Sequence, residues 1–157
     1  MLGLRGRLHP AITNIQTTHS VKKMRPHVKM LAGNYLTLEE KSQQSGGSPY
    51  CQLYMNTTDS SNETNIETIE HLISICSGMA QTRNNILNSM KKVCRESGVN
   101  IHIDSLSNTE LTQFILDPSS LNLKKRVNIN HPILPTLFQL SRDFCYKIDR
   151  DRLKKLK

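Results

Sequence analysis

The chain has 157 residues, of which 36% are hydrophobic, seven are aromatic and none is tryptophan. This length suits one small domain with a thin core and excludes a polymerase or another large enzyme that needs several domains. The 21 Lys and Arg residues outnumber the 13 Asp and Glu residues and give a net charge of +8, which favours a polyanionic partner, with nucleic acid before an anionic membrane surface.

Targeting signals are missing from the printed sequence. The basic residues near Met1 are not followed by an apolar stretch of signal-peptide length, and no run approaches the ~20 apolar residues of a membrane span. We therefore expect an intracellular protein of the nucleus or cytoplasm, not secreted and with no membrane partner. In a reducing compartment the four cysteines are expected to be thiols or metal ligands rather than disulfides.

The first half of the chain predicts little regular structure. Residues 1–20 lack a sustained apolar period and are expected to form a disordered lead-in to a single helical domain over residues 21–157. The stretch Val21–Leu38 is compatible with a short helix or with turns. Thr37 and Glu40 form a capping-box pattern that predicts a helix to about Gln44, and a polar loop follows over 56–65.

The second half predicts a mainly α fold. A capping-box pattern at 64–67 and apolar residues at helical spacing predict a helix from Ile66 that ends at Gly78, and a second helix is expected over 80–96. The alternation in 99–103 predicts one short extended segment, too little for a sheet. A third capping-box pattern, Ser107 to Glu110, begins a helix that ends at 117–118, and a last helix is expected from near 132 into the charged end.

Basic residues gather at both ends of the chain, around an acidic middle. Residues 1–50 hold seven basic and two acidic residues, residues 51–123 hold four and eight, and residues 124–157 hold ten and three. We expect the basic groups to contact phosphates. The candidates are Lys22, Lys23, Arg25 and Lys29, then Lys124, Lys125 and Arg126, and then Arg152, Lys154 and Lys155.

Three residues have the chemistry of a zinc site. Cys51, His71 and Cys76 offer two thiolates and an imidazole, which Zn²⁺ prefers in a closed tetrahedral site. Tyr54 stands where a Cys-x2-Cys knuckle needs its second thiolate, and a phenol with a pKa near 10 is a poor ligand. His27 and His102 are candidates for a fourth ligand. The alternative is no cofactor at all, with Cys76 in the core and His71 at the surface or capping a helix.

The motifs of hydrolytic and transfer enzymes are missing. The sequence has no Gly-x-Ser-x-Gly, no phosphate-binding loop followed by Lys-Ser/Thr and no His-Glu-x-x-His. Glu70 and His71 are adjacent on a helix and point about 100° apart, so they cannot act as an acid–base pair. Cys94 and Cys145 lie on apolar stripes and are expected in the core. We expect no catalysis, and few aromatic residues on which bases could stack: Tyr35, Tyr50 and Tyr54.

Several segments resemble one family. Arg25–Thr37, Lys41–Leu53, Glu67–Cys76, Leu140–Cys145 and Arg152–Lys157 are together similar to the C-terminal region of non-LTR retrotransposon polyproteins, downstream of the reverse transcriptase. The segments occur in the same order, and the similarity covers roughly residues 21–157. The most specific feature is a Gly-Gly-Ser-Pro loop before a Cys, followed later by His-x4-Cys.

The resemblance implies a degenerate zinc knuckle. In that family a Cys-x2-Cys and a His-x4-Cys bind zinc and are thought to help hold RNA or target DNA. Cys51, His71 and Cys76 match three of the four positions and Tyr54 departs at the other. The polymerase aspartates and the endonuclease domain have no counterpart in this chain. The resemblance therefore implies a degenerate or host-domesticated remnant of a mobile element that binds nucleic acid without catalysis.

Two other readings remain open from the sequence. The chain is alternatively a small helical module that binds an acidic or helical partner through the helix at 80–96 or the helix at 132–150. It is also compatible with a remnant that has no selected function. The two binding functions differ in salt dependence, because phosphate contacts release condensed counterions and make affinity for nucleic acid fall steeply with salt.

Overall fold

A computed structural model describes residues 18–53, 65–99, 101–121 and 131–156 of the chain. Within these ranges the fold is mainly α, as the sequence predicted, and no strand is present apart from an isolated antiparallel bridge between Tyr50 and Ile66. None of the described helices is long and apolar enough to cross a membrane.

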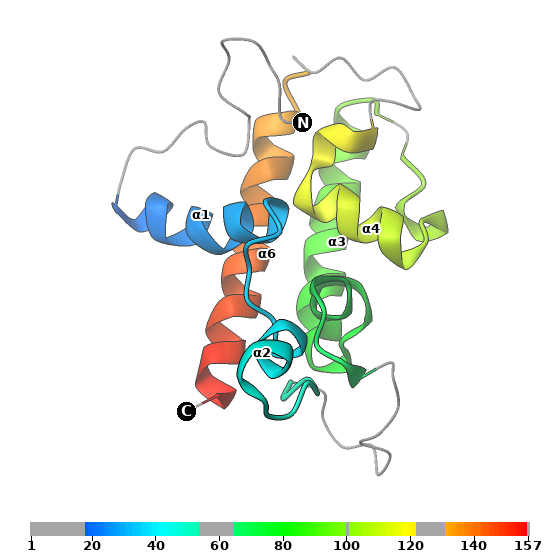
Figure 1. Cartoon of the computed structure of the whole chain (residues 1–157). Helices are drawn as coiled ribbons and strands as arrows, with labels where there is room; N and C mark the ends of the chain where they lie inside the picture. Colours follow the sequence, from blue (N-terminus) through cyan, green and yellow to red (C-terminus); the bar gives the residue numbers. More distant parts are fainter. Residues whose placement is uncertain (1–17, 54–64, 100, 122–130, 157) are drawn as a thin grey trace.

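The long helix α6, Leu134–Lys155, organises the fold. Helix α1, Thr18–Leu31, lies across α6, and α3, Ala80–Glu96, lies alongside it (Figure 1). The stretch Val21–Leu38, which the sequence left open between helix and turns, is helical as far as Leu31, with Pro26 inside the helix. Because α1 begins at Thr18, the predicted disordered lead-in over 1–20 is wrong for its last three residues, and the rest of it lies outside the described residues. One side of α6 is buried along its whole length because its apolar residues recur at helical spacing, from Leu137 to Ile148.

Two predicted capping boxes are confirmed. Thr37 caps α2, Leu38–Ser45, and Ser107 caps α4, Asn108–Leu116. In each case the carboxylate of the glutamate three residues later accepts a hydrogen bond from the backbone N–H of the capping residue. Gly46, with a φ of 75°, ends α2.

The capping box predicted at 64–67 is wrong at Glu67, the member of the pair that the structure describes. Thr64 lies outside the described residues, and the Glu67 carboxylate accepts a bond from the backbone N–H of Leu38 at 2.8 Å instead. The hydroxyl of Thr68 accepts from the N–H of His71 at 2.9 Å and starts a shorter helical segment than predicted. That segment contains the π-helix η3, His71–Ile75, and the 3₁₀ turn η4, Ser77–Met79, leads from it into α3.

The segment predicted to be extended over 99–103 pairs with no strand among the described residues, and its last residue belongs to a 3₁₀ turn instead. After Gly98 the described residues form a loop and a 3₁₀ turn, η5, Ile103–Ser105, and Val99 and Ile101 pack against the core. Within the described ranges no strand lies beside this segment, and the apolar side chains of Val99 and Ile101 pack against helices instead. A further 3₁₀ turn, η6, Pro118–Leu121, follows α4.

The core consists of two clusters that share α6 and α3. One contains Leu72, Ile73 and Phe144 together with Cys51 and Cys76. The other contains Met90 and Cys94 from α3, Phe114 from α4, and Leu137 and Phe138 from α6. Cys94 and Cys145 are buried thiols, as predicted. The first cluster therefore surrounds the residues predicted to bind metal.

Candidate metal centre and basic groove

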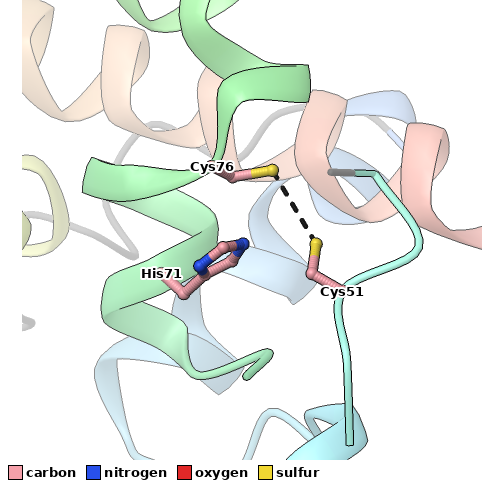
Figure 2. Close-up of side chains that lie close together, drawn as sticks. All are labelled: Cys51, His71 and Cys76. Atoms are coloured by element: carbon pink, nitrogen blue, oxygen red, sulfur yellow. Dashed lines mark hydrogen bonds between the residues drawn. The ribbon is translucent and has the colours of Figure 1, made fainter. Parts of the chain in front are cut away.

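Cys51, His71 and Cys76 converge on one point, although 25 residues separate the two cysteines. Their ligand atoms all lie within 4.8 Å of one another, and the two Sγ atoms are 3.7 Å apart (Figure 2). All three side chains are buried, and His71 is only 1% exposed. The alternative considered from the sequence placed His71 at the surface or in a helix cap. His71 is instead buried.

Backbone pairing holds the segment of Cys51 in place. The N–H of Cys51 donates to the carbonyl of Asn65 at 2.9 Å, and the N–H of Glu67 donates to the carbonyl of Pro49 at 2.9 Å. These bonds lie on either side of the bridge between Tyr50 and Ile66. The segment that carries Cys51 therefore runs antiparallel to the segment that enters η3.

The π-helix brings His71 and Cys76 to the same side. In an α-helix two residues five apart would point about 140° apart. Here the N–H of Cys76 donates to the carbonyl of His71 at 2.7 Å, which is the i to i+5 bond of a π turn. The wider turn places the two side chains on one face, so the His-x4-Cys spacing becomes a pair of neighbouring ligands.

Gly78 permits the two cysteine-bearing segments to touch. A Cβ atom at Gly78 would overlap the carbonyl oxygen of Leu53 and lie 2.8 Å from its carbonyl carbon. The backbone of Leu53 therefore occupies space that any other residue at position 78 would need. The sequence suggested that Gly78 stops a helix, but its function in the fold is this close approach.

The two thiols share one hydrogen bond and titrate as a pair. The bond from Cys51, the charge of His71 and the N–H of Gly78 lower the pKa of Cys76 to about 5, although burial opposes the shift. The same sulfur–sulfur contact and burial raise the pKa of Cys51. At neutral pH the pair therefore holds one thiolate and one thiol. The Arg83 guanidinium, which donates to the carbonyl of Cys76 at 3.1 Å, adds positive charge beside the thiolate.

The donor set fits zinc at three positions. Zn–S bonds of ~2.3 Å in a tetrahedral site place two sulfurs about 3.8 Å apart, and the sulfurs of Cys51 and Cys76 are 3.7 Å apart. Among the described residues, only His71 joins them. Zinc bound here would be held by the two thiolates and the imidazole, and it would link the Cys51 segment to η3.

Neither histidine considered as a fourth ligand reaches the cluster. The Nε2 atom of His27 lies 2.7 Å from the carbonyl oxygen of Leu116, and the His27 ring packs near that of Phe138. His102 lines a separate cavity beside Lys91. Tyr54, which stands at the second position of the motif, lies outside the described residues.

A buried ion pair lies next to Cys51 and His71 and involves a residue that was predicted to contact phosphate. Arg152, expected to contact phosphate, is buried, and its Nε donates to Glu67 Oε1 at 2.7 Å. Its guanidinium also lies over the ring of Tyr35, 5.4 Å from the centroid, and the Tyr35 hydroxyl donates to Asp149 at 3.0 Å. Arg152 therefore makes its contacts inside the fold and does not offer its guanidinium to phosphate. Tyr35 is buried as well and offers no surface for stacking.

A basic groove follows α6 where α1 meets it. Its volume is about 450 Å³, and four basic and two acidic side chains line it with Tyr146. Asp143, Lys147, Arg150 and Lys154 recur every three or four residues and form one stripe of α6. Lys23 reaches this stripe from α1 and pairs with Asp143 at 2.8 Å. The guanidinium of Arg150 lies 5.9 Å from the centre of the Tyr146 ring.

The other residues predicted to contact phosphate lie on α1, at the end of α6 or outside the described residues. Lys22, Arg25 and Lys29 are exposed and form one stripe of α1. Lys154 lines the groove, and the neighbouring exposed Lys155 projects about 100° away around α6. Lys124, Lys125 and Arg126 lie outside the described residues.

Lys147 and Tyr146 are groove residues that the sequence reasoning missed. They stand between the apolar residues of α6, where neither forms a run with other basic or aromatic residues. A helical projection of the last helix would have placed Lys147 on the stripe of Arg150 and Lys154.

No family model, curated protein or solved structure matches the chain.

Proposed function

We propose that this chain is a non-catalytic nucleic-acid-binding domain, a remnant of the kind of region that follows the reverse transcriptase in non-LTR retrotransposon polyproteins. The observation that carries the proposal is the basic groove of α6, because it gathers four cationic side chains on one surface. The convergence of Cys51, His71 and Cys76 supports it, because three positions of the family's knuckle meet in space. In this proposal zinc stabilises the fold and the groove contacts phosphates.

The groove suits a phosphate backbone better than a small anion. Lys147, Arg150 and Lys154 extend over two turns of α6, about 10 Å, which exceeds the spacing of successive phosphates along a strand. The acidic side chains of Asp143 and Asp151 in the same groove lower the local charge. We therefore expect moderate, salt-sensitive binding without base readout, for which the groove offers one aromatic ring, Tyr146.

A salt titration with a matched control tests the groove. Affinity for random-sequence single-stranded RNA is measured at several salt concentrations for the full chain and for Lys147→Gln/Lys154→Gln. Loss of two phosphate contacts reduces the slope of log affinity against log salt by about 1.4. The control, Lys41→Gln/Lys92→Gln, removes the same charge at exposed positions outside the groove. Equal effects of the two pairs would mean that net charge alone, and no particular surface, attracts RNA.

Metal analysis tests the proposed zinc separately. Protein purified without chelator is expected to carry zinc, and Cys51→Ser is expected to lose it. Since the fourth ligand of the motif is replaced by tyrosine, Tyr54→Cys is expected to raise zinc affinity if the knuckle geometry is retained. If the wild type carries well under one zinc per chain and Tyr54→Cys does not raise that amount, zinc is removed from the proposal. The proposal for the groove would be unaffected.

The alternative of a helical interaction module has less support. Among the described residues, the exposed large apolar side chains are Val21, Leu36, Ile75, Leu153 and Leu156, and none lies within 80–96 or 132–150. Those two helices use their apolar faces in the core. Absence of any RNA or DNA binding at low salt would favour the alternative over the proposal.

A further inference from the structure

Cys51 and Cys76 form a pair of thiols poised to bond to each other. Their sulfurs are in contact at 3.7 Å, whereas the sulfurs of a disulfide are ~2.05 Å apart. Cys76 follows the last residue of η3, and Cys51 lies in an irregular segment next to a single bridge. Neither residue is inside a regular helix, and closing the gap requires the two side chains to rotate about their Cα–Cβ bonds toward each other. We propose that Cys51 and Cys76 are a disulfide-forming site that is oxidised by peroxide when zinc is absent.

The packing around the pair keeps the two sulfurs together. The bonds from Cys51 to Asn65 and from Glu67 to Pro49 fix one segment, and the contact of Gly78 with Leu53 fixes the other side. Cys94 and Cys145 are equally buried, but among the described residues the only sulfur–sulfur contact is between Cys51 and Cys76. Disulfide formation needs a second nearby sulfur, so among the four cysteines we expect it between Cys51 and Cys76.

The reaction balances with hydrogen peroxide as the oxidant. One thiolate sulfur attacks a peroxide oxygen, the O–O bond breaks, and the leaving hydroxide takes up a proton and departs as water. The other sulfur attacks the sulfenic acid formed, its own proton goes to the departing oxygen, and a second water leaves as the S–S bond forms. Two thiols and one peroxide thus give one disulfide and two waters, with two electrons passing from sulfur to peroxide.

Metal and disulfide exclude each other at this site. Zinc needs both sulfurs as thiolates, and the disulfide removes both. With Tyr54 in place of the second cysteine of the motif, zinc is expected to be held less tightly than in a complete knuckle, which leaves the pair more often open to oxidation. Loss of zinc and closure of the disulfide would then keep the Cys51 segment joined to η3 by a covalent bond instead of a metal.

Mass spectrometry of the full chain tests the proposal. Metal-free reduced protein is treated with hydrogen peroxide, unfolded in acid, alkylated with maleimide and digested with trypsin. Both cysteines fall in the peptide 42–83, which is expected to lose two hydrogens and to take no maleimide. Cys94 and Cys145, in the peptides 93–95 and 143–147, are internal controls that are expected to be alkylated fully. A sulfinic acid in 42–83, or alkylation equal to that of the controls, overturns the proposal.

A variant and a metal titration complete the test. Cys94→Ser is expected to form the disulfide as the wild type does, whereas Cys51→Ser leaves a sulfenic acid at Cys76 that dimedone traps. With free zinc at 100 times its Kd, the rate of disulfide formation in the wild type is expected to fall by about 100-fold, because only metal-free protein reacts. An unchanged rate under saturating zinc would refute the mutual exclusion. These outcomes do not depend on nucleic-acid binding, so failure of either proposal is recognised separately.

Discussion

Arg152→Met separates a residue that stabilises the fold from one that binds phosphate. In the structure the side chain of Arg152 is 9% exposed and that of Glu67 is fully buried. Removing the guanidinium leaves the Glu67 carboxylate in the core with one remaining hydrogen bond, from Leu38. Breaking a buried ion pair in this way costs about 3–5 kcal/mol, a large fraction of the ~5–15 kcal/mol that stabilises a domain.

The assay is urea unfolding followed by circular dichroism, with chelator and reductant present. Glu67→Gln/Arg152→Met is the informative partner variant, because Gln retains an acceptor for the N–H of Leu38 and no charge is stranded. We expect the double variant to recover most of the loss. Lys154→Met is the matched control, since Lys154 is exposed and its ion pair with Asp151, at 3.4 Å, lies at the surface; it is expected to change stability by less than about 1 kcal/mol.

The effect of Arg152→Met also depends on pH. Burial raises the pKa of Glu67 in the folded state, and Arg152 opposes that rise. A carboxyl group with a raised folded pKa favours folding below its unfolded pKa and loses this contribution as pH rises through the folded pKa. Without Arg152 the folded pKa rises further, so the deficit of the variant is expected to shrink as pH falls from 7 toward 4.5. A deficit below about 1 kcal/mol at pH 7, or a double variant no more stable than Arg152→Met, would refute this reasoning.

Two further predictions concern the candidate metal site of Cys51, His71 and Cys76. Metal-free protein at pH 7 is expected to show thiolate absorbance at 240 nm, which disappears in an acid titration with a midpoint near pH 5. The absorbance is expected to be lost in Cys76→Ser but retained in Cys94→Ser. A midpoint near pH 9 would contradict the proton shared by Cys51 and Cys76. Gly78→Ala is expected to destabilise the fold by about 1–3 kcal/mol and to weaken zinc binding, because the added methyl group displaces the backbone of Leu53. Ser77→Ala, at an exposed neighbour, is the control, and equal unfolding midpoints for the two variants would show that the contact is dispensable.

The sequence by itself determined the helical fold and the three candidate ligands. Helix α3 matches its predicted range, and two capping boxes begin helices where expected, because these signals act within a few residues of the chain. Cys51, His71 and Cys76 could be named from residue chemistry and spacing, and the structure brings their three side chains together.

Only the tertiary structure decided how individual charged residues are used. Glu67 had the spacing of a capping residue and Arg152 stood in a basic run, yet they pair with each other across 85 positions of sequence. Local patterns cannot show such a pair, because burial of both groups depends on where α6 crosses the segment that precedes η3. The contact between Gly78 and Leu53 likewise depends on packing between segments that are distant in the chain.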